Sequence, residues 1–328
     1  MSPFFSFREI VPLASERKQQ IAYLKAVIEP ELAALEKQYN TAFSKLTQQK
    51  IFDYYAVFVP VVLGKSFCRL FGRDLQPTEL RLQTLQGIIT PFFDDFFDIE
   101  NLPDERIRLM MENPFEATPH TLMQEAFIKY GKEIKSNVKD ISFFNDISEK
   151  VFAAQILSRK QELSSISRDE VKTITAKKGG TSLLFYYSVL DLPKDDTILQ
   201  IIYDTGSLLQ LSNDIFDTYK DREKSIITLP ACYTNIVELH TYFTEQYNTL
   251  CDKILSLPFP KKNIRSFFFR INVMLTLTFV ALEQFVSIQE KHGGKFILKN
   301  CSRKELICDR AKMSNLVKWF RYTYQLHN

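Results

Sequence analysis

The segment LRLQTLQGIITPFFDDFFDI, Leu80 to Ile99, places apolar residues at steps of three and four. That spacing is typical of an α-helix with one buried face. The chain contains only nine glycines and few Asn-Gly or Asp-Gly turns, so a sheet has little to build on. The same helical period recurs over residues 11–60, with a break near Pro30, and in Thr121 to Lys135, Ile147 to Leu163, Asp169 to Leu190, Asp196 to Tyr219, Thr234 to Leu255, Ile264 to Glu290 and Cys301 to Gln325.

These segments predict an all-α protein of roughly ten helices, arranged as one helical bundle. We find no internal repeat of fixed period and no Pro/Ser/Gly-rich linker, so residues 1–328 are interpreted as a single domain. The stretch from Asn101 to Pro119 contains three prolines besides several charges, and it is predicted to be a loop.

Composition limits the classes of function. The chain of 328 residues is 45% hydrophobic and 25% charged, as in soluble globular proteins. Its net charge of +3 does not favour a nucleic-acid partner. Five cysteines without a CxxC pair argue against a zinc site and a disulfide framework, and the N-terminus does not read as a signal peptide, so a cytoplasmic protein is expected. The apolar stretch Ser266 to Ile288 contains Arg270 and Glu283, which favours a buried helix over a membrane span.

The end of the first segment, FFDDFFDIE, sets three aspartates among four phenylalanines. On a helix, Asp94 and Asp98 project from one face and Asp95 lies beside them. Their charges repel one another and lose hydration near the apolar rings, so a cation is expected there. Clustered hard oxygen ligands suit Mg²⁺. The alternative is a solvated acidic helix end, which is common at protein surfaces.

A second acidic segment strengthens the metal-binding interpretation. In LLQLSNDIFDTYKDREKS, Asn213, Asp217 and Asp221 follow at four-residue steps and form one stripe along a helix, with Asp214 just off it. If the two acidic segments face each other across a bundle, they can hold several Mg²⁺ ions with a diphosphate between them.

The pair DDFFD and NDIFDTYKD resembles the two metal motifs of class I terpene synthases and related isoprenoid synthases. The second motif begins with Asn-Asp, as in the cyclase branch, although Asp217 replaces the usual Ser or Thr. The Gly-Lys-Arg segment of prenyltransferases and the DxDD motif of protonation-initiated cyclases are absent from the sequence. The resemblance spans roughly Leu80 to Tyr322 in motif order, but is specific only at these two places.

The resemblance implies a helical bundle with a central active-site cavity, and a cofactor of three Mg²⁺ ions bound together with the substrate diphosphate. It implies Asp94, Asp95, Asp98, Asn213, Asp217 and Asp221 as metal ligands. Cations near the motifs are expected to stabilise the leaving diphosphate, and the candidates are Lys177, Lys178, Lys220, Arg222, Arg321 and, as a further substrate-binding residue, Arg168. Each of them could instead be an ordinary surface residue.

Three weaker features agree with this picture. The Arg321-Tyr322 pair matches an Arg-Tyr pair that binds diphosphate in many microbial terpene synthases as the site closes. Gly179-Gly180 could break a helix beside the diphosphate, or could simply be a helix C-cap. Aromatic faces stabilise carbocations, and the rings closest to the motifs are Phe92, Phe93 and Phe185; each could equally be plain core.

The sequence therefore predicts a Mg²⁺-dependent terpene synthase that ionises an allylic prenyl diphosphate, with a homodimer compatible with the resemblance. The first alternative is a prenyltransferase or head-to-head condensing enzyme of the same fold. The alternative of another class is a non-catalytic helical interaction protein whose acidic clusters are surface features.

Overall fold

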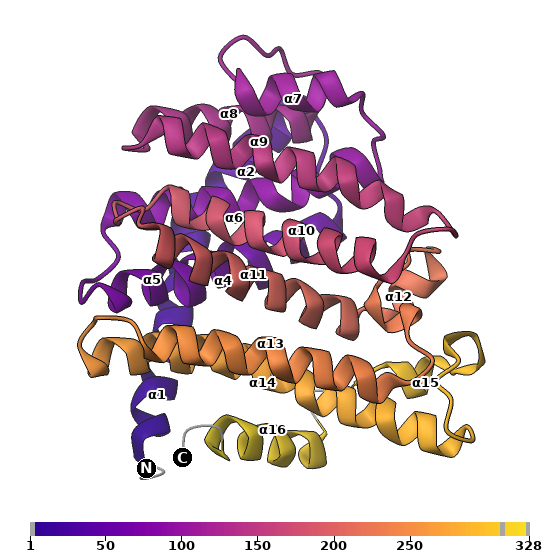
Figure 1. Cartoon of the computed structure of the whole chain (residues 1–328). Helices are drawn as coiled ribbons and strands as arrows, with labels where there is room; N and C mark the ends of the chain where they lie inside the picture. The colour runs from indigo at the N-terminus through magenta and orange to yellow at the C-terminus, as the bar shows by residue number, and fades with distance from the viewer. Residues whose placement is uncertain (1–3, 309–311, 326–328) are drawn as a thin grey trace. The chain divides into compact units, whose positions relative to one another are not determined.

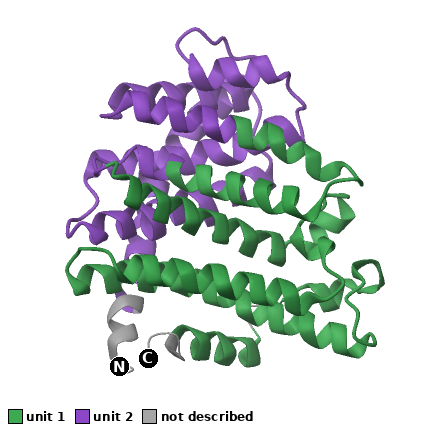
Figure 2. Cartoon of the chain, in the orientation of Figure 1, with its two compact units in different colours: residues 1–5, 153–184, 194–328 green, residues 6–152, 185–193 purple. Residues whose placement is uncertain are grey.

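The computed structural model describes the backbone of residues 4–308 and 312–325, and this part of the chain is helical with no β-strand (Figure 1). The all-α prediction is confirmed. Contacts group the chain into two compact units, where the sequence alone suggested one domain (Figure 2). We name them the N-terminal unit, residues 6–152 and 185–193, and the C-terminal unit, mainly residues 153–184 and 194–328.

The N-terminal unit is organised around α6 (Pro77–Asp98), which contacts α8 and the helical segments that precede it. Residues 82–89 of α6 are all buried, as expected of a central helix. A capping box between Gln76 and Glu79 fixes the start of α6. The other elements are α1 (Phe4–Tyr23), η1 (Leu24–Ile28), α2 (Glu29–Tyr39), α3 (Lys45–Gln49), η2 (Lys50–Tyr55), α4 (Ala56–Phe58), η3 (Val59–Gly64), α5 (Lys65–Leu70), α7 (Asp104–Glu112) and α8 (Leu122–Asn137).

The C-terminal unit is built on α14 (Lys261–Lys291), which contacts α11, α13, α15 and α16. Helices α9 (Ile141–Ser158) and α10 (Arg168–Ser188) each have residues in both units. The remaining elements are η4 (Arg159–Glu162), α11 (Asp196–Phe216), α12 (Thr218–Glu223), η5 (Leu229–Cys232), α13 (Ile236–Leu255), η6 (Leu298–Asn300), α15 (Arg303–Leu306) and α16 (Met313–Gln325).

The break predicted near Pro30 is a change of helical winding rather than a loop. Residues Leu24–Ile28 form a π-helical turn, and α2 then begins with Pro30 in its first turn. Proline lacks the backbone N–H and its ring crowds the carbonyl four residues earlier, which a wider turn relieves.

Three of the secondary-structure predictions were wrong. The segment 101–119 contains helix α7, because Pro103 and Pro114 lie outside its two ends and Ile107 and Met110 bury one face. The helix predicted for Asp196 to Tyr219 ends at Phe216, and α12 follows it. The segment predicted as one helix from Cys301 to Gln325 contains two separate helices, α15 and α16.

Gly179 and Gly180 do not break a helix, and they are not a C-cap, because α10 runs through both of them. They allow close contact with α11. A Cβ atom on Gly179 would lie 2.1 Å from the carbonyl oxygen of Gly206, and one on Gly180 would lie 2.4 Å from the ring of Tyr203. The glycines therefore set the spacing of α10 and α11 within the C-terminal unit.

Two helical stretches are long and apolar enough for a membrane span by composition alone, Lys45–Leu70 and Lys261–Lys291. In each, 61% of the most apolar window is buried inside the protein, and core helices of soluble proteins have the same properties. Arg270, within the second stretch, is 1% exposed.

Candidate functional site

The first acidic segment forms the last turns of α6, in the N-terminal unit. Its three aspartates have different surroundings: Asp95 is 2% exposed, Asp94 is half-buried and Asp98 is exposed. The ammonium group of Lys50 donates a hydrogen bond of 2.6 Å to Asp95 Oδ1. The cation expected for this segment is thus supplied, for Asp95, by a lysine of η2. No local sequence pattern identifies Lys50, since its partner lies 45 positions away.

Asp94 and the rings of this segment adjoin other aromatic groups of the N-terminal unit. Burial, with a contribution from the charge of Asp94, raises the pKa of Tyr186. Phe92 is fully buried and stacks on Phe43 at 5.3 Å, and Phe93 packs edge-on against Phe97 at 5.1 Å. Phe185 is half-buried, with Phe144 5.6 Å away. Each candidate ring is therefore in contact with at least one other ring.

The second acidic segment spans the junction of α11 and α12 in the C-terminal unit. Although α11 ends before Asp217, the backbone bonds from Asp217 N–H to Asn213 and from Asp221 N–H to Asp217 are both 2.8 Å. The four-residue spacing of a helix is therefore kept across the junction. Asn213 is exposed, whereas Asp217 and Asp221 are half-buried.

Asp214 projects away from this stripe into the contact between α10 and α11. It is 5% exposed and accepts hydrogen bonds from Thr175 at 2.8 Å and from Gln210 at 2.8 Å. Burial raises the pKa of Asp214 above its usual range, although these two bonds and the charge of Lys178 oppose that effect. The surroundings of the Asp214 carboxyl thus consist of two neutral hydrogen-bond donors and the charge of one nearby lysine.

Asp221 lies close to the other carboxylates of the second segment. Burial, reinforced by the charges of Asp214 and Asp217, raises the pKa of Asp221 to about 7, and Lys220 and Lys178 oppose the shift. Lys220 pairs with Asp217 at 3.0 Å. The surroundings of Asp221 therefore disfavour its ionised form, and a bound cation would favour that form.

The other candidate cations have varied surroundings. Lys177 is exposed on α10. Arg168 pairs with Glu238 at 3.3 Å and lies 4.9 Å from the centre of the Tyr233 ring. Arg222 donates hydrogen bonds to the carbonyl oxygens of two residues of the η6 region, Leu298 at 3.0 Å and Cys301 at 2.7 Å. Among the lysines and arginines predicted from sequence, Lys178 and Lys220 act on the second acidic segment: both oppose the pKa shift of Asp221, and Lys220 pairs with Asp217.

Arg321 and Tyr322 lie on α16, which packs against α14. Arg321 is exposed. The Tyr322 hydroxyl donates a hydrogen bond to the Glu283 carboxylate, and its ring stacks on Phe279 at 5.0 Å. Burial and Glu283 raise the pKa of Tyr322. Tyr322 is therefore already engaged within the C-terminal unit.

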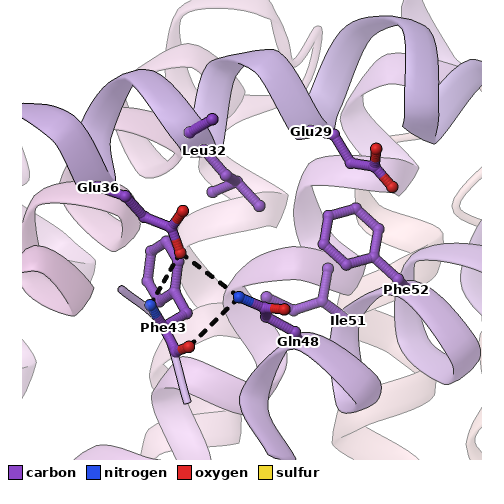
Figure 3. A pocket seen from close by; sticks show the side chains of 8 residues that line it. Glu29, Leu32, Glu36, Phe43, Gln48, Ile51 and Phe52 are labelled. Atoms are coloured by element: carbon purple, nitrogen blue, oxygen red, sulfur yellow. Dashed lines mark hydrogen bonds between the residues drawn. The ribbon is translucent and has the colours of Figure 1, made fainter. Parts of the chain in front are cut away.

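An apolar groove of about 250 Å³ lies in the N-terminal unit between α2 and the segment that follows it (Figure 3). Leu32, Phe43 and Ile51 contribute apolar surface, and Glu29 and Glu36 also line the groove. The Glu36 carboxylate accepts a hydrogen bond of 2.9 Å from the Phe43 backbone N–H (Figure 3). With two glutamates and no basic residue in its lining, this groove would repel a diphosphate.

Within either unit, the described residues include no group of three or more His, Cys, Asp and Glu side chains arranged to hold a metal ion. The donors of the second segment, two carboxylates and the Asn213 amide, suit Mg²⁺ only with water or phosphate oxygens completing its shell.

No family model, curated protein or solved structure gives a significant match to the chain. The resemblance to isoprenoid synthases thus rests on the two motifs.

Replacing Lys50 should destabilise the protein, because it leaves the buried Asp95 carboxylate without its cation. We expect a coupling energy of about 1 to 3 kcal/mol in a Lys50→Met/Asp95→Asn cycle, measured by urea unfolding. The pair Lys139–Asp191, 2.5 Å apart with both side chains mostly exposed, is the matched control. Its coupling should stay below about 0.5 kcal/mol. Equal coupling in both pairs would show that Asp95 does not depend on Lys50.

The pKa of Asp221 predicts a pH-dependent stability. An unfolded aspartate titrates near pH 4, so the folded protein binds this proton more tightly. This tighter binding of the proton stabilises the folded state. The stabilisation is fully present below about pH 4 and is lost as the pH rises through about 7. Asp221→Asn should therefore stabilise the metal-free protein at pH 8, by on the order of 1 kcal/mol, but not at pH 4. Urea unfolding at pH 4 and at pH 8 measures this difference. Glu245→Gln, at an exposed site on α13, is the control and should leave the free energy of unfolding unchanged at both pH values.

Proposed function

We propose that the protein is a Mg²⁺-dependent isoprenoid synthase of the class I terpene synthase type, which ionises an allylic prenyl diphosphate. The observation that carries this proposal is the second acidic segment. Asn213, Asp217 and Asp221 keep helical spacing, and burial, reinforced by the charges of Asp214 and Asp217, raises the pKa of Asp221 to about 7. A fully solvated helix end would not raise the pKa of a carboxyl group in this way.

The residues fit the cofactor that the motif implies. Asn213, Asp217 and Asp221 offer hard oxygen donors, and the second segment has only two carboxylates on its stripe, so phosphate oxygens are needed to complete the shell. Bound Mg²⁺ would supply electrostatic stabilisation of the charge that develops on departing diphosphate. Asp94 and Asp98 are the corresponding ligands in the first segment.

The chain's own residues have separate roles in this proposal. Lys178 and Lys220 are charged groups beside the second segment, where they would attract the diphosphate. Close contact at Gly179 keeps α10, and with it Lys178, next to α11. Phe92, Phe93 and Phe185 would offer ring faces to an allylic cation and would exclude water.

The test is turnover of allylic diphosphates of C10 to C25 by the purified protein with Mg²⁺, with and without isopentenyl diphosphate. Release of inorganic diphosphate with a terpene product that does not need isopentenyl diphosphate is the expected result. Elongated products that require isopentenyl diphosphate would identify a prenyltransferase. Absence of turnover with every diphosphate, in protein that is folded by circular dichroism, would reject both enzymes.

A helical interaction protein remains the second candidate, and one observation favours it. Asp95, at the centre of the first motif, is buried and paired with Lys50 rather than directed at an open site. In that case the first acidic segment stabilises the fold through its ion pair, and Asp98 is an ordinary surface charge.

Metal and diphosphate should bind cooperatively. Because two carboxylates and an amide leave most of the Mg²⁺ shell to other oxygens, we expect diphosphate to tighten Mg²⁺ binding by about tenfold, with the reciprocal effect of Mg²⁺ on diphosphate. Isothermal titration of each ligand with and without the other measures this coupling. Sulfate in place of diphosphate is the control, and equal Mg²⁺ affinity in the presence and absence of diphosphate would contradict the proposed site.

A further inference from the structure

Positive charge is concentrated near the C-terminal end of the sequence. From Lys291 to Asn328 there are nine lysines and arginines against two acidic residues, although the whole chain has a net charge of only +3. The preceding 290 residues are therefore net acidic. Charge asymmetry of this kind indicates a local interaction with an anionic partner that the total charge conceals.

Within that region, α16 has two different faces. One face joins it to α14: Trp319 Nε1 donates a hydrogen bond of 2.9 Å to the Val273 carbonyl oxygen, and the hydroxyls of Thr323 and Thr276 are 2.9 Å apart. These contacts fix the orientation of α16 in the C-terminal unit, so its other face is presented outward.

The outer face of α16 carries an apolar stripe. Met313, Val317 and Phe320 follow at helical spacing and are 72%, 63% and 42% exposed. Exposed apolar residues occur singly on most proteins, but three along one helical face form a continuous surface that marks an interaction site.

The chain on and before α16 carries exposed positive charge. The segment Met313–Gln325 contains no acidic residue. Lys312 and Arg321 are exposed, as are three basic residues that precede α16 in the chain, Lys299, Arg303 and Lys304. Lys318 pairs with Glu283 at 2.7 Å, which reduces the contribution of Lys318 to the positive charge of α16.

A second copy of the chain fits this surface poorly. A symmetric dimer through α16 would bring Lys312 and Arg321 of both copies together, and like charges at an interface oppose association. An anionic bilayer fits both features, because its headgroups attract the lysines and arginines while the boundary of its acyl region accepts the apolar stripe. We propose that the outer face of α16 is a peripheral attachment site for an anionic lipid surface.

Binding to vesicles of defined composition is a direct test of this proposal. The full-length protein is mixed with vesicles of phosphatidylcholine alone, or of phosphatidylcholine and phosphatidylglycerol in equal parts. We expect co-sedimentation with the anionic vesicles only, weakened by raised salt. Each basic residue near the surface contributes about fivefold to binding, so anionic vesicles should bind at least about a hundredfold more tightly than neutral ones.

Two variants distinguish vesicle binding that depends on the apolar stripe from binding that depends only on the charge of the protein. Val317→Asp should lower anionic-vesicle binding at least about tenfold, because it places a carboxylate at the acyl boundary. Leu255→Asp, at a position 56% exposed on α13, is the matched control and should bind as the parent does. Thermal melting shows whether either variant is still folded, and Met313→Ser provides a milder change of the same stripe.

Three results would overturn the proposal: no binding to anionic vesicles, equal binding to neutral and anionic vesicles, or equal loss in Val317→Asp and Leu255→Asp. A dimer in light scattering that Val317→Asp dissociates, without vesicle binding by the parent, would assign the surface to a second copy of the chain. The measurement is independent of turnover, so it stands whether or not the proposed enzyme activity is found.

Discussion

Asn213→Ala is expected to lower turnover of an allylic prenyl diphosphate at least about a hundredfold, because it removes an oxygen donor required while charge develops on the leaving group. Asn213 is exposed on the last turn of α11, so its removal should leave folding intact. Asp94→Ala, at the end of α6, should have an effect of the same size. Steady-state release of inorganic diphosphate measures both.

The double variant tests whether the two acidic segments act on one diphosphate. If they do, the second substitution should cost far less than the first, because residues that act as a unit are non-additive. Independent, multiplying effects would mean that the segments do not share a site. Glu245→Ala, an exposed acidic site on α13, is the control and should keep full activity. Near-normal activity in both single variants would remove the basis of the assignment.

Gly179→Ala is expected to be the most destabilising small substitution in the C-terminal unit. The added methyl group would lie 2.1 Å from the Gly206 carbonyl oxygen and 2.5 Å from Gln210 Cβ. A backbone atom cannot move aside as a flexible side chain does, so α10 and α11 must separate. We expect a loss of about 3 kcal/mol or more and a fall in melting temperature of about 4 °C or more. Thermal unfolding followed by circular dichroism measures it.

Gly131→Ala is the matched control, since Gly131 also lies inside a helix, α8, but has no atom closer than 3.7 Å to the added carbon. There the better helix propensity of alanine should stabilise the protein by about 0.5 to 1 kcal/mol. If Gly179→Ala behaved like Gly131→Ala, the close contact of α10 and α11 would be refuted. A fall in activity larger than the loss of folded protein would link this contact to the placement of Lys178.

The sequence by itself determined the helical class and the acidic stripe. Both depend on spacing between near neighbours: a period of three and four residues defines a buried helical face, and Asn213, Asp217 and Asp221 align because each lies about one turn after the last. The backbone bonds across the α11–α12 junction preserve that alignment. Such features need no knowledge of what packs against the helix.

Only the tertiary structure decided how the conspicuous residues are used. Lys50 pairs with Asp95 from a distant part of the chain, so no local pattern could identify it. The glycines of α10 suggested a helix break because glycine is flexible, yet they allow close packing against Gly206 and Tyr203 of α11. The prolines near α7 suggested a loop, but they lie outside its ends. Local periodicity is set by residues one turn apart, whereas partners, burial and helix contacts arise when distant segments meet, and the free energy of that packing overrides local preference.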